Sequence, residues 1–210
     1  MVFIFTGCGK GFEEENKIQF EVYARNYIAT LKPINRYFRN SKATLKASVA
    51  ENQLWVRVFY FGSNSDNAFI QLIHSGSSCP NSKSDTNHDG HVDFEEAVAA
   101  SGRIFIPLDA NLSSRFRGLD KFPSARKKGK YYYSESANFE FMVRELADPL
   151  DDFTLPFDTL ENVNDFQLAN KVFIIYGIRF NTRLPSSFRS YHGYSEQELY
   201  PILCGIITRG

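Results

Sequence analysis

Residues 85–96, with the sequence DTNHDGHVDFEE, place oxygen-bearing groups at regular intervals. Candidate ligands stand at positions 1, 3, 5, 7, 9 and 12 of this stretch, namely Asp85, Asn87, Asp89, His91, Asp93 and Glu96. His91 is expected to offer only its backbone carbonyl, and Gly90 at position 6 permits the sharp turn that the spacing requires. Because a hard divalent cation takes roughly six to eight oxygen ligands, this spacing predicts a calcium site.

The flanking residues indicate how this loop is held. The run EEAVAAS after the loop predicts a short helix that ends at Gly102. Before Asp85, the serine-rich stretch HSGSSCPNSKS contains Pro80 and cannot be helical. Val92, at position 8, is expected to anchor the loop to the protein body. The sequence therefore predicts an isolated calcium loop rather than a paired EF-hand sensor. A solvated acidic turn is the alternative, since Asp, Asn and Gly are also common in loops.

The composition favours one sizeable domain. The chain has 210 residues, of which 43% are hydrophobic and 15% aromatic. We expect residues 17–210 to form this domain, with the calcium loop inserted at about 79–101. Lysine plus arginine and aspartate plus glutamate number 24 each, so no global field favours nucleic acid or an anionic membrane. No stretch of sequence is long enough to span a membrane.

The N-terminal residues, MVFIFTGC, predict a membrane anchor of another kind. They resemble the lipobox of bacterial lipoproteins, in which a small residue precedes a cysteine that becomes lipid-modified. Cys8 would then be the lipid anchor, and residues 1–16 the lipobox-like N-terminus and tether. No basic segment precedes the short apolar run, which a start codon upstream of Met1 would explain. A frayed apolar terminus or a first strand is the alternative.

The cysteine count bears on the compartment. The chain has three cysteines, and if Cys8 carries lipid, Cys79 and Cys204 remain as a natural disulfide pair. A disulfide indicates an oxidising compartment. Two free thiols in a cytosolic protein are the alternative, but a calcium loop fits better outside the cytosol, where free calcium is abundant.

Most of the chain alternates apolar and polar residues as strands do. The expected strands cover residues 17–34 (as one or two strands), 43–50, 53–61, 68–76, 103–109, 130–136, 171–180 and 200–209. A helix is expected over residues 138–146, with Phe139, Met142, Val143 and Leu146 on its apolar face. The acidic segment 147–170 is read as an irregular surface excursion that could also supply cation ligands. The pattern predicts an antiparallel β-sandwich with one or two short helices.

Several of these strings resemble a chordin-type (CHRD) domain over most of residues 24–208. The strings are YIATLKPI, ATLKASVAENQLWVRVFYFG, AFIQLIHSG and RIFIPLD. The C-terminal ILCGII resembles the last strand of copper–zinc superoxide dismutase. The resemblance implies a Greek-key sandwich of the superoxide dismutase-like or immunoglobulin-like kind. It also implies a disulfide between Cys79, after the histidine-bearing strand, and Cys204.

The dismutase chemistry does not follow from the resemblance. Copper and zinc need several imidazoles, and the histidines are His74, His88, His91 and His192, two of which lie in the calcium loop. Only His74 occupies the position of the dismutase H-x-H pair, and Tyr176 stands where a further ligand is expected. We therefore expect His74 to be a half-buried structural residue that bonds the neighbouring loop and the Cys79 region.

Other catalytic patterns are missing from the sequence. It contains no GxSxG motif and no phosphate-binding glycine loop. The stretch ARKKGKYYY at residues 125–133 mixes cations with tyrosines and could bind nucleic acid or an anionic sugar. A solvated turn leading into a strand with alternate tyrosines packed inward is the favoured interpretation.

These patterns together predict a non-catalytic calcium-binding protein of the bacterial cell envelope, periplasmic or attached as an outer-membrane lipoprotein. One calcium ion, the only expected cofactor, would stabilise an inter-strand loop of the sandwich. The expected partners are calcium and an unidentified envelope protein or surface ligand, without nucleic acid. The membrane attachment would be peripheral, through the lipid anchor. The alternatives are a dismutase-like metalloenzyme with degenerate copper and zinc ligands and a calcium-dependent adhesion or partner-binding module.

Overall fold

Nine strands and two helices make up the regular structure of the described part of the chain. The computed structural model describes residues 24–35, 38–62, 69–112, 121–125, 129–147, 155–159, 166–191 and 193–210. In chain order the elements are β1 (Arg25–Pro33), β2 (Lys42–Ala50), β3 (Gln53–Phe61), β4 (Ile70–His74), α1 (Phe94–Ser101), β5 (Ile104–Pro107), β6 (Lys130–Asn138), α2 (Phe139–Ala147), β7 (Val172–Tyr176), β8 (Pro201–Ile206) and β9 (Thr208–Arg209).

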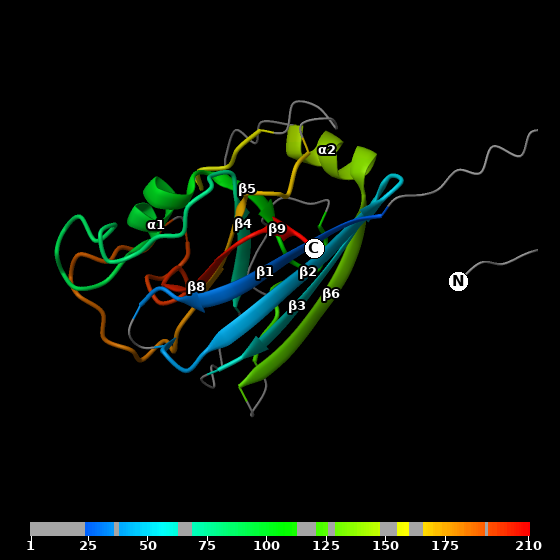
Figure 1. The fold of residues 1–210 in the computed structure, drawn as a ribbon. Helices are drawn as coiled ribbons and strands as arrows, with labels where there is room; N and C mark the ends of the chain where they lie inside the picture. Colours follow the sequence, from blue (N-terminus) through cyan, green and yellow to red (C-terminus); the bar gives the residue numbers. More distant parts are fainter. Residues whose placement is uncertain are drawn as a thin grey trace, which may run out of the picture.

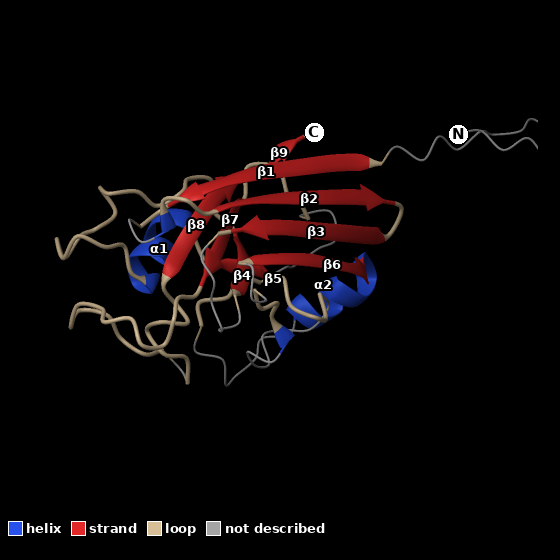
Figure 2. Cartoon of the chain, turned by 90° about the horizontal axis from the view of Figure 1, so that it is seen from below, coloured by secondary structure: helices blue, strands red, loops and turns tan. Residues whose placement is uncertain are grey.

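The strands form one continuous sheet, in the order β5-β4-β7-β8-β1-β2-β3-β6, with β9 paired to β1. All of these pairings are antiparallel. The sheet is curled, so that the long strands β1, β2, β3 and β6 lie in front of β4 and β5 (Figure 1). Figure 2 shows the same strands from below, with α1 and α2 near opposite ends. The predicted mainly antiparallel β fold with short helices is confirmed.

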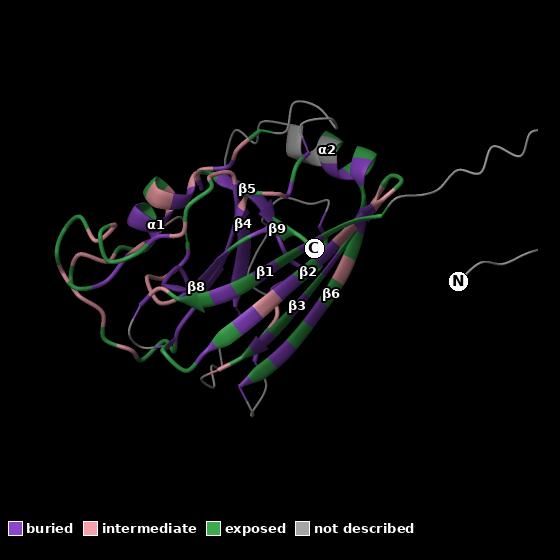
Figure 3. Ribbon diagram, viewed as in Figure 1, coloured by how far each residue is buried: buried purple, intermediate pink, exposed green. Residues whose placement is uncertain are grey.

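The half-sheet made of β1, β2, β3 and β6 has one buried face and one exposed face. On β3, Leu54 and Val56 are fully buried, whereas the intervening Trp55 and the following Arg57 are exposed. This alternation is visible along all four strands (Figure 3). A period of two is what a sheet with one wet face requires. The predicted hairpin of residues 43–61, with its turn at Glu51 and Asn52, is therefore confirmed.

The half-sheet made of β4, β5, β7 and β8 is buried on both faces. Nearly every residue in these four strands is buried, which explains their continuous apolar runs. One face, including Ile73 and Phe173, packs in the same cluster as the inward residues of β1, β2, β3 and β6. The opposite face, including Leu72 and Ile174, forms a second cluster with side chains of the insertion that follows β4.

Strand β1 belongs to both half-sheets. It pairs with β2 from Arg25 to Leu31 and then with β8 at Lys32 and Pro33. Because one strand continues from one half to the other, the two halves are fixed relative to each other by backbone hydrogen bonds. The predicted segment 17–34 is thus a strand from Arg25 onward, and residues 17–23 lie outside the described residues.

The two helices have different local causes. Asp93 caps α1 and forms a capping box with Glu96, and Gly102, with a φ of 82°, ends the helix as predicted. Helix α2 follows β6 directly and buries Phe139 and Met142, as predicted. Of the acidic segment 147–170, residues 148–154 and 160–165 lie outside the described part of the chain. No helix among the described residues combines the length and apolar character needed to cross a membrane.

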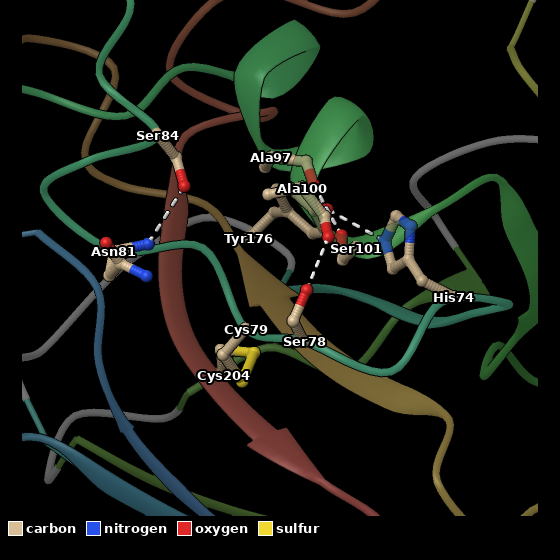
Figure 4. Close-up of a disulfide and its surroundings, with 10 residues drawn as sticks. All are labelled: His74, Ser78, Cys79, Asn81, Ser84, Ala97, Ala100, Ser101, Tyr176 and Cys204. Atoms are coloured by element: carbon tan, nitrogen blue, oxygen red, sulfur yellow. Dashed lines mark hydrogen bonds between the residues drawn. A yellow bond between two sulfur atoms is a disulfide. The ribbon is translucent and has the colours of Figure 1, made fainter.

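A disulfide joins Cys79, in the insertion, to Cys204 on β8, with Cα atoms 5.8 Å apart. The predicted pairing is confirmed. Figure 4 shows it below α1, where it ties the insertion to β8, the strand that borders β1. The two residues are separated by 125 positions in the sequence, so the bond closes a long loop in the unfolded chain.

Replacing both disulfide cysteines, in Cys79→Ser/Cys204→Ser, is expected to lower the free energy of unfolding by about 4 to 5 kcal/mol, since the unfolded chain regains the entropy of an open loop. Urea unfolding under non-reducing conditions measures this. Cys8→Ser is the matched control and is expected to leave the midpoint unchanged. A loss below about 1 kcal/mol in the double variant would contradict the prediction.

Candidate calcium loop

The candidate ligands lie in an insertion between β4 and β5 that leaves and rejoins the sheet at one place. At its base, the Ser75 amide donates to the Arg103 carbonyl and the Gly76 amide donates to the Ser101 carbonyl, at 2.9 and 2.8 Å. A Cβ on Gly76 would lie 2.4 Å from the Ser101 carbonyl oxygen, so this closure needs glycine. The entry to the loop is irregular and its exit is α1, as the sequence predicted.

In the first half of the loop, side-chain oxygens accept hydrogen bonds from the loop's own backbone amides. The carboxylate of Asp85 accepts hydrogen bonds from the amides of Asp89 (3.2 Å) and Gly90 (2.9 Å). The side-chain oxygen of Asn87 accepts from the Asp89 amide at 3.0 Å, and Oδ1 of Asp89 accepts from the His91 amide at 2.8 Å. Gly90 has a φ of 87°, a left-handed value that suits glycine. The alternate side chains of positions 1, 3 and 5 therefore all turn back toward the loop.

Glu96 at position 12 joins the beginning and the end of the loop. Its Oε1 accepts hydrogen bonds from the amides of Thr86 and Asn87, at 2.7 and 3.2 Å, and from the Thr86 hydroxyl at 2.8 Å. Its Oε2 accepts from the Asp93 amide at 3.1 Å. The Glu96 side chain is buried. One carboxylate thus holds positions 2, 3 and 9 within a single hydrogen-bond network.

The loop concentrates negative charge. Burial is the main reason that the pKa of Asp93 is raised; its hydrogen bond from the Glu96 amide opposes this, and the nearby carboxylates of Glu96, Glu95 and Asp89 raise it further. Asp89 also accepts a hydrogen bond from Ser187, a residue in the segment between β7 and β8. The donor groups are oxygens, which suits a hard cation and not a soft one.

The loop as it stands is hydrogen-bonded to itself. Across the residues that the structure describes, no group of three or more His, Cys, Asp or Glu side chains has an arrangement that could hold a metal ion. Each carboxylate oxygen has lone pairs beyond the one that a backbone amide occupies. The donor atoms are therefore chemically suited to a hard cation, and in this structure they accept hydrogen bonds from the loop's own amides.

Two side chains outside the motif, Asn35 and Tyr200, fix the loop to the sheet, and sequence reasoning missed both. Asn35, just after β1, is buried; its amide donates to the carbonyls of Val92 and Pro201, and its oxygen accepts from the Val92 amide, all at 2.9 Å. The His91 ring is buried and lies 2.8 Å from the Tyr200 hydroxyl through Nδ1. The imidazole is therefore turned into the protein body, and Val92 is buried beside it.

His74 is fully buried, which corrects the expectation of a half-buried side chain. Its Nδ1 lies 2.9 Å from the Gly102 carbonyl and its Nε2 lies 2.8 Å from the Tyr176 hydroxyl. Because Gly102 offers only an acceptor, Nδ1 carries the proton and Nε2 accepts from Tyr176. Figure 4 shows the ring beside the last turn of α1, not at the disulfide. Both ring nitrogens are therefore engaged in holding α1 against β4 and β7.

The other sequence-predicted features fall elsewhere. Cys8, the predicted lipid anchor, lies outside the described residues, as does His192. Of the basic and aromatic stretch 125–133, residues 126–128 also lie outside. In the remainder, Tyr131 and Tyr133 are buried and Tyr132 is exposed, so the prediction that alternate tyrosines pack inward is confirmed.

Removing the Asn35 side chain in Asn35→Ala is expected to lower the free energy of unfolding by about 2 to 4 kcal/mol, because three buried backbone groups lose their partner. Urea denaturation measures this change. Asn52→Ala removes an exposed asparagine whose amide contacts Glu140 and is expected to lower stability by less than about 0.5 kcal/mol. Equal effects of the two variants would contradict the role given to Asn35.

Acid should weaken the fold through His74. Burial lowers the pKa of His74 from 6.5 to about 4, although its bond to Gly102 opposes the shift. The folded state holds this ring neutral while the unfolded state binds a proton below pH 6.5, so the contribution is complete above that pH and is lost toward pH 4. The stability advantage of the wild type over His74→Gln is expected to shrink by about 2 to 3 kcal/mol between pH 7 and pH 4.5.

Asp109 is the control for His74, because its contribution to stability changes with pH in the opposite direction. Its carboxyl is buried and its Oδ2 has no hydrogen-bond partner among the described residues. Burial raises the pKa of Asp109 to about 6, so this group favours the folded state increasingly as the pH falls through 6. Asp109→Asn should therefore make the loss of stability on acidification steeper. A difference between wild type and His74→Gln that does not change with pH would contradict the prediction.

Comparison with known proteins adds nothing to these contacts. No protein-family model matches the chain, and no curated protein matches its sequence.

Proposed function

We propose that this protein is a non-catalytic calcium-binding protein in which one ion stabilises the insertion between β4 and β5. The observation that carries the proposal is the position of Glu96. Its carboxylate accepts hydrogen bonds from the amides at the start of the loop, while Glu96 itself lies in the first turn of α1. A residue at position 12 of a calcium loop has to be in this place, because it must close the shell around ligands from positions 1 to 9.

The chain's own residues prepare the site. The capping box fixes Asp93 and Glu96 at the start of a helix whose N-terminus favours negative charge. The Asn35 side chain fixes Val92, and with it the middle of the loop, to the sheet. Bound calcium would offset the repulsion among Asp85, Asp89, Asp93 and Glu96. The gain would appear as stability of the folded state, since the unfolded chain does not hold these four groups together.

The disulfide supports an extracytoplasmic location, because such bonds persist in oxidising compartments. We further propose that the protein lies in the bacterial cell envelope and is attached through a lipid on Cys8. The chordin-type or dismutase-like assignment also stays a proposal, supported by the antiparallel sheet and by Cys79 bonding Cys204. A dismutase-like activity is less favoured, since both nitrogens of His74 are engaged in hydrogen bonds.

Calcium at about 100 times its dissociation constant is expected to stabilise the protein by about 2.7 kcal/mol, which corresponds to a rise in Tm of about 5 to 10 °C. Tm is measured in excess calcium, in excess magnesium and in chelator. Glu96→Gln is expected to abolish the rise while keeping the capping box, since glutamine can serve at this position.

The matched control is Glu95→Gln, which removes one carboxylate from the neighbouring, exposed position. It is expected to keep the calcium-dependent rise. Equal Tm values with calcium and with chelator in the wild type would refute the proposal, as would an equal loss in the two glutamine variants.

A further inference from the structure

The exposed face of β1, β2, β3 and β6 carries side chains in registered rows. From β1 across to β6 the first three rows are Asn26–Ser48–Trp55–Ser136, Ile28–Lys46–Arg57–Ser134 and Thr30–Thr44–Phe59–Tyr132. A fourth row, from β2 to β6, is Lys42–Phe61–Lys130. Hydroxyl, cationic and aromatic groups therefore alternate over the exposed face of the curled sheet.

The charged side chains that these four strands present on this face have one sign. Its outward positions include Lys42, Lys46, Arg57 and Lys130. The sole carboxylate in the four strands, Glu135, lies opposite the buried Val56 and so belongs to the inward face. Lys46 and Arg57 stand directly opposite each other, a pairing of like charges that destabilises a sheet. An anion bound between them would relieve that repulsion.

Four aromatic side chains on this face are exposed to solvent. The exposed fractions are 42% for Trp55, 47% for Phe59, 46% for Phe61 and 56% for Tyr132. Phe59 and Tyr132 contact each other with ring centroids 4.8 Å apart. The ammonium groups of Lys42 and Lys130 lie 5.7 and 5.0 Å from the centre of the Phe61 ring, which keeps both cations on this face.

A groove of about 540 Å³ crosses this surface between β1 and β3. The groove is lined by Trp55, Lys46 and Arg57 together with Ser48 and Asn26, and Gly210 lies at its β1 side. The groove therefore offers an indole, two cations and two small hydrogen-bonding groups to one ligand.

We propose that this face binds a linear acidic polysaccharide. The C–H face of a sugar ring packs against Trp55, since an open indole offers apolar area and dispersion contacts. Arg57 and Lys46 pair with the carboxylates of the uronate residues, for which the guanidinium fork is well shaped. Ser48 and Asn26 hydrogen-bond the ring hydroxyls. Further sugars along β3 meet Phe59 and the cations beside Phe61.

Other occupants fit this face less well. A second copy of the chain would place the four cations against the same four cations. Single-stranded nucleic acid also uses cations and stacking rings on a sheet, but the Cys79–Cys204 disulfide indicates an oxidising compartment, where a polysaccharide is the more accessible polyanion. An anionic membrane would favour a continuous apolar patch, whereas Arg57 separates Trp55 from Phe59 and Phe61 along β3.

Trp55 makes the test direct, because it is the only tryptophan in the chain. The full chain is titrated with a hexasaccharide of mannuronate, and Trp55 fluorescence is recorded in chelator so that the calcium loop does not contribute. A saturable change that weakens with added salt is expected. A neutral hexasaccharide of glucose is expected to give no saturable change at the same concentrations.

Lys46→Gln/Arg57→Gln is expected to weaken mannuronate binding at least tenfold. The matched control, Lys83→Gln/Arg183→Gln, removes two exposed cations outside this face and is expected to change affinity less than twofold. Near-ultraviolet circular dichroism and Tm establish that both variants are folded. No binding by the wild type, an equal loss in both double variants, or tighter binding to oligo(dT) or to anionic phosphatidylglycerol vesicles would each overturn the proposal. The calcium-dependent Tm is a separate readout that none of these results changes.

Discussion

The fold depends on covering the second face of the half-sheet formed by β4, β5, β7 and β8. Its first face packs against the other half-sheet, so its second face would expose a continuous apolar surface unless other segments cover it. The cover comes from the insertion after β4, which contributes Val92, Phe94 and Ala97. The segment between β7 and β8 adds Tyr194 and Leu199. Neither covering segment forms a strand of its own in this layer, so its conformation has to be fixed by other interactions.

The candidate calcium loop is one of these fixing interactions. The insertion is held at four points: the glycine-lined base at Gly76, the disulfide at Cys79, the Asn35 contacts at Val92 and the capping box at Asp93. The candidate ligands from Asp85 to His91 lie between the second and the third of these points, and Asp93 and Glu96 form the fourth. Val92 and Phe94, which cover the core, flank the candidate ligand Asp93 directly. A change that orders the loop therefore also fixes the residues that cover the core. This connection explains how an ion bound at the surface could change the stability of the whole domain.

The sequence was sufficient for the features that depend on neighbours along the chain. Alternation along β3, the short helix after the loop and its glycine stop at Gly102 could all be read directly, because each follows from a local rule. The role of Asn35 could not, since its partners are 57 and 166 positions away and a turn asparagine looks the same whether it is exposed or buried. The full burial of His74 was missed because a strand covered on both faces has no alternation to show which polar residue is internal.

The formal net charge of zero conceals a separation of charge that only the fold reveals. The sequence places four acids in one loop, but the cations of the exposed face are distributed over the β2–β3 hairpin and over β6, which lies much further along the chain. Antiparallel pairing brings Lys46 opposite Arg57 and sets Lys42 and Lys130 on either side of Phe61. The same pairing puts Glu135, the one acid of these strands, on the inward face. Balanced composition therefore does not make the surface neutral, because strand register decides which charges share a face.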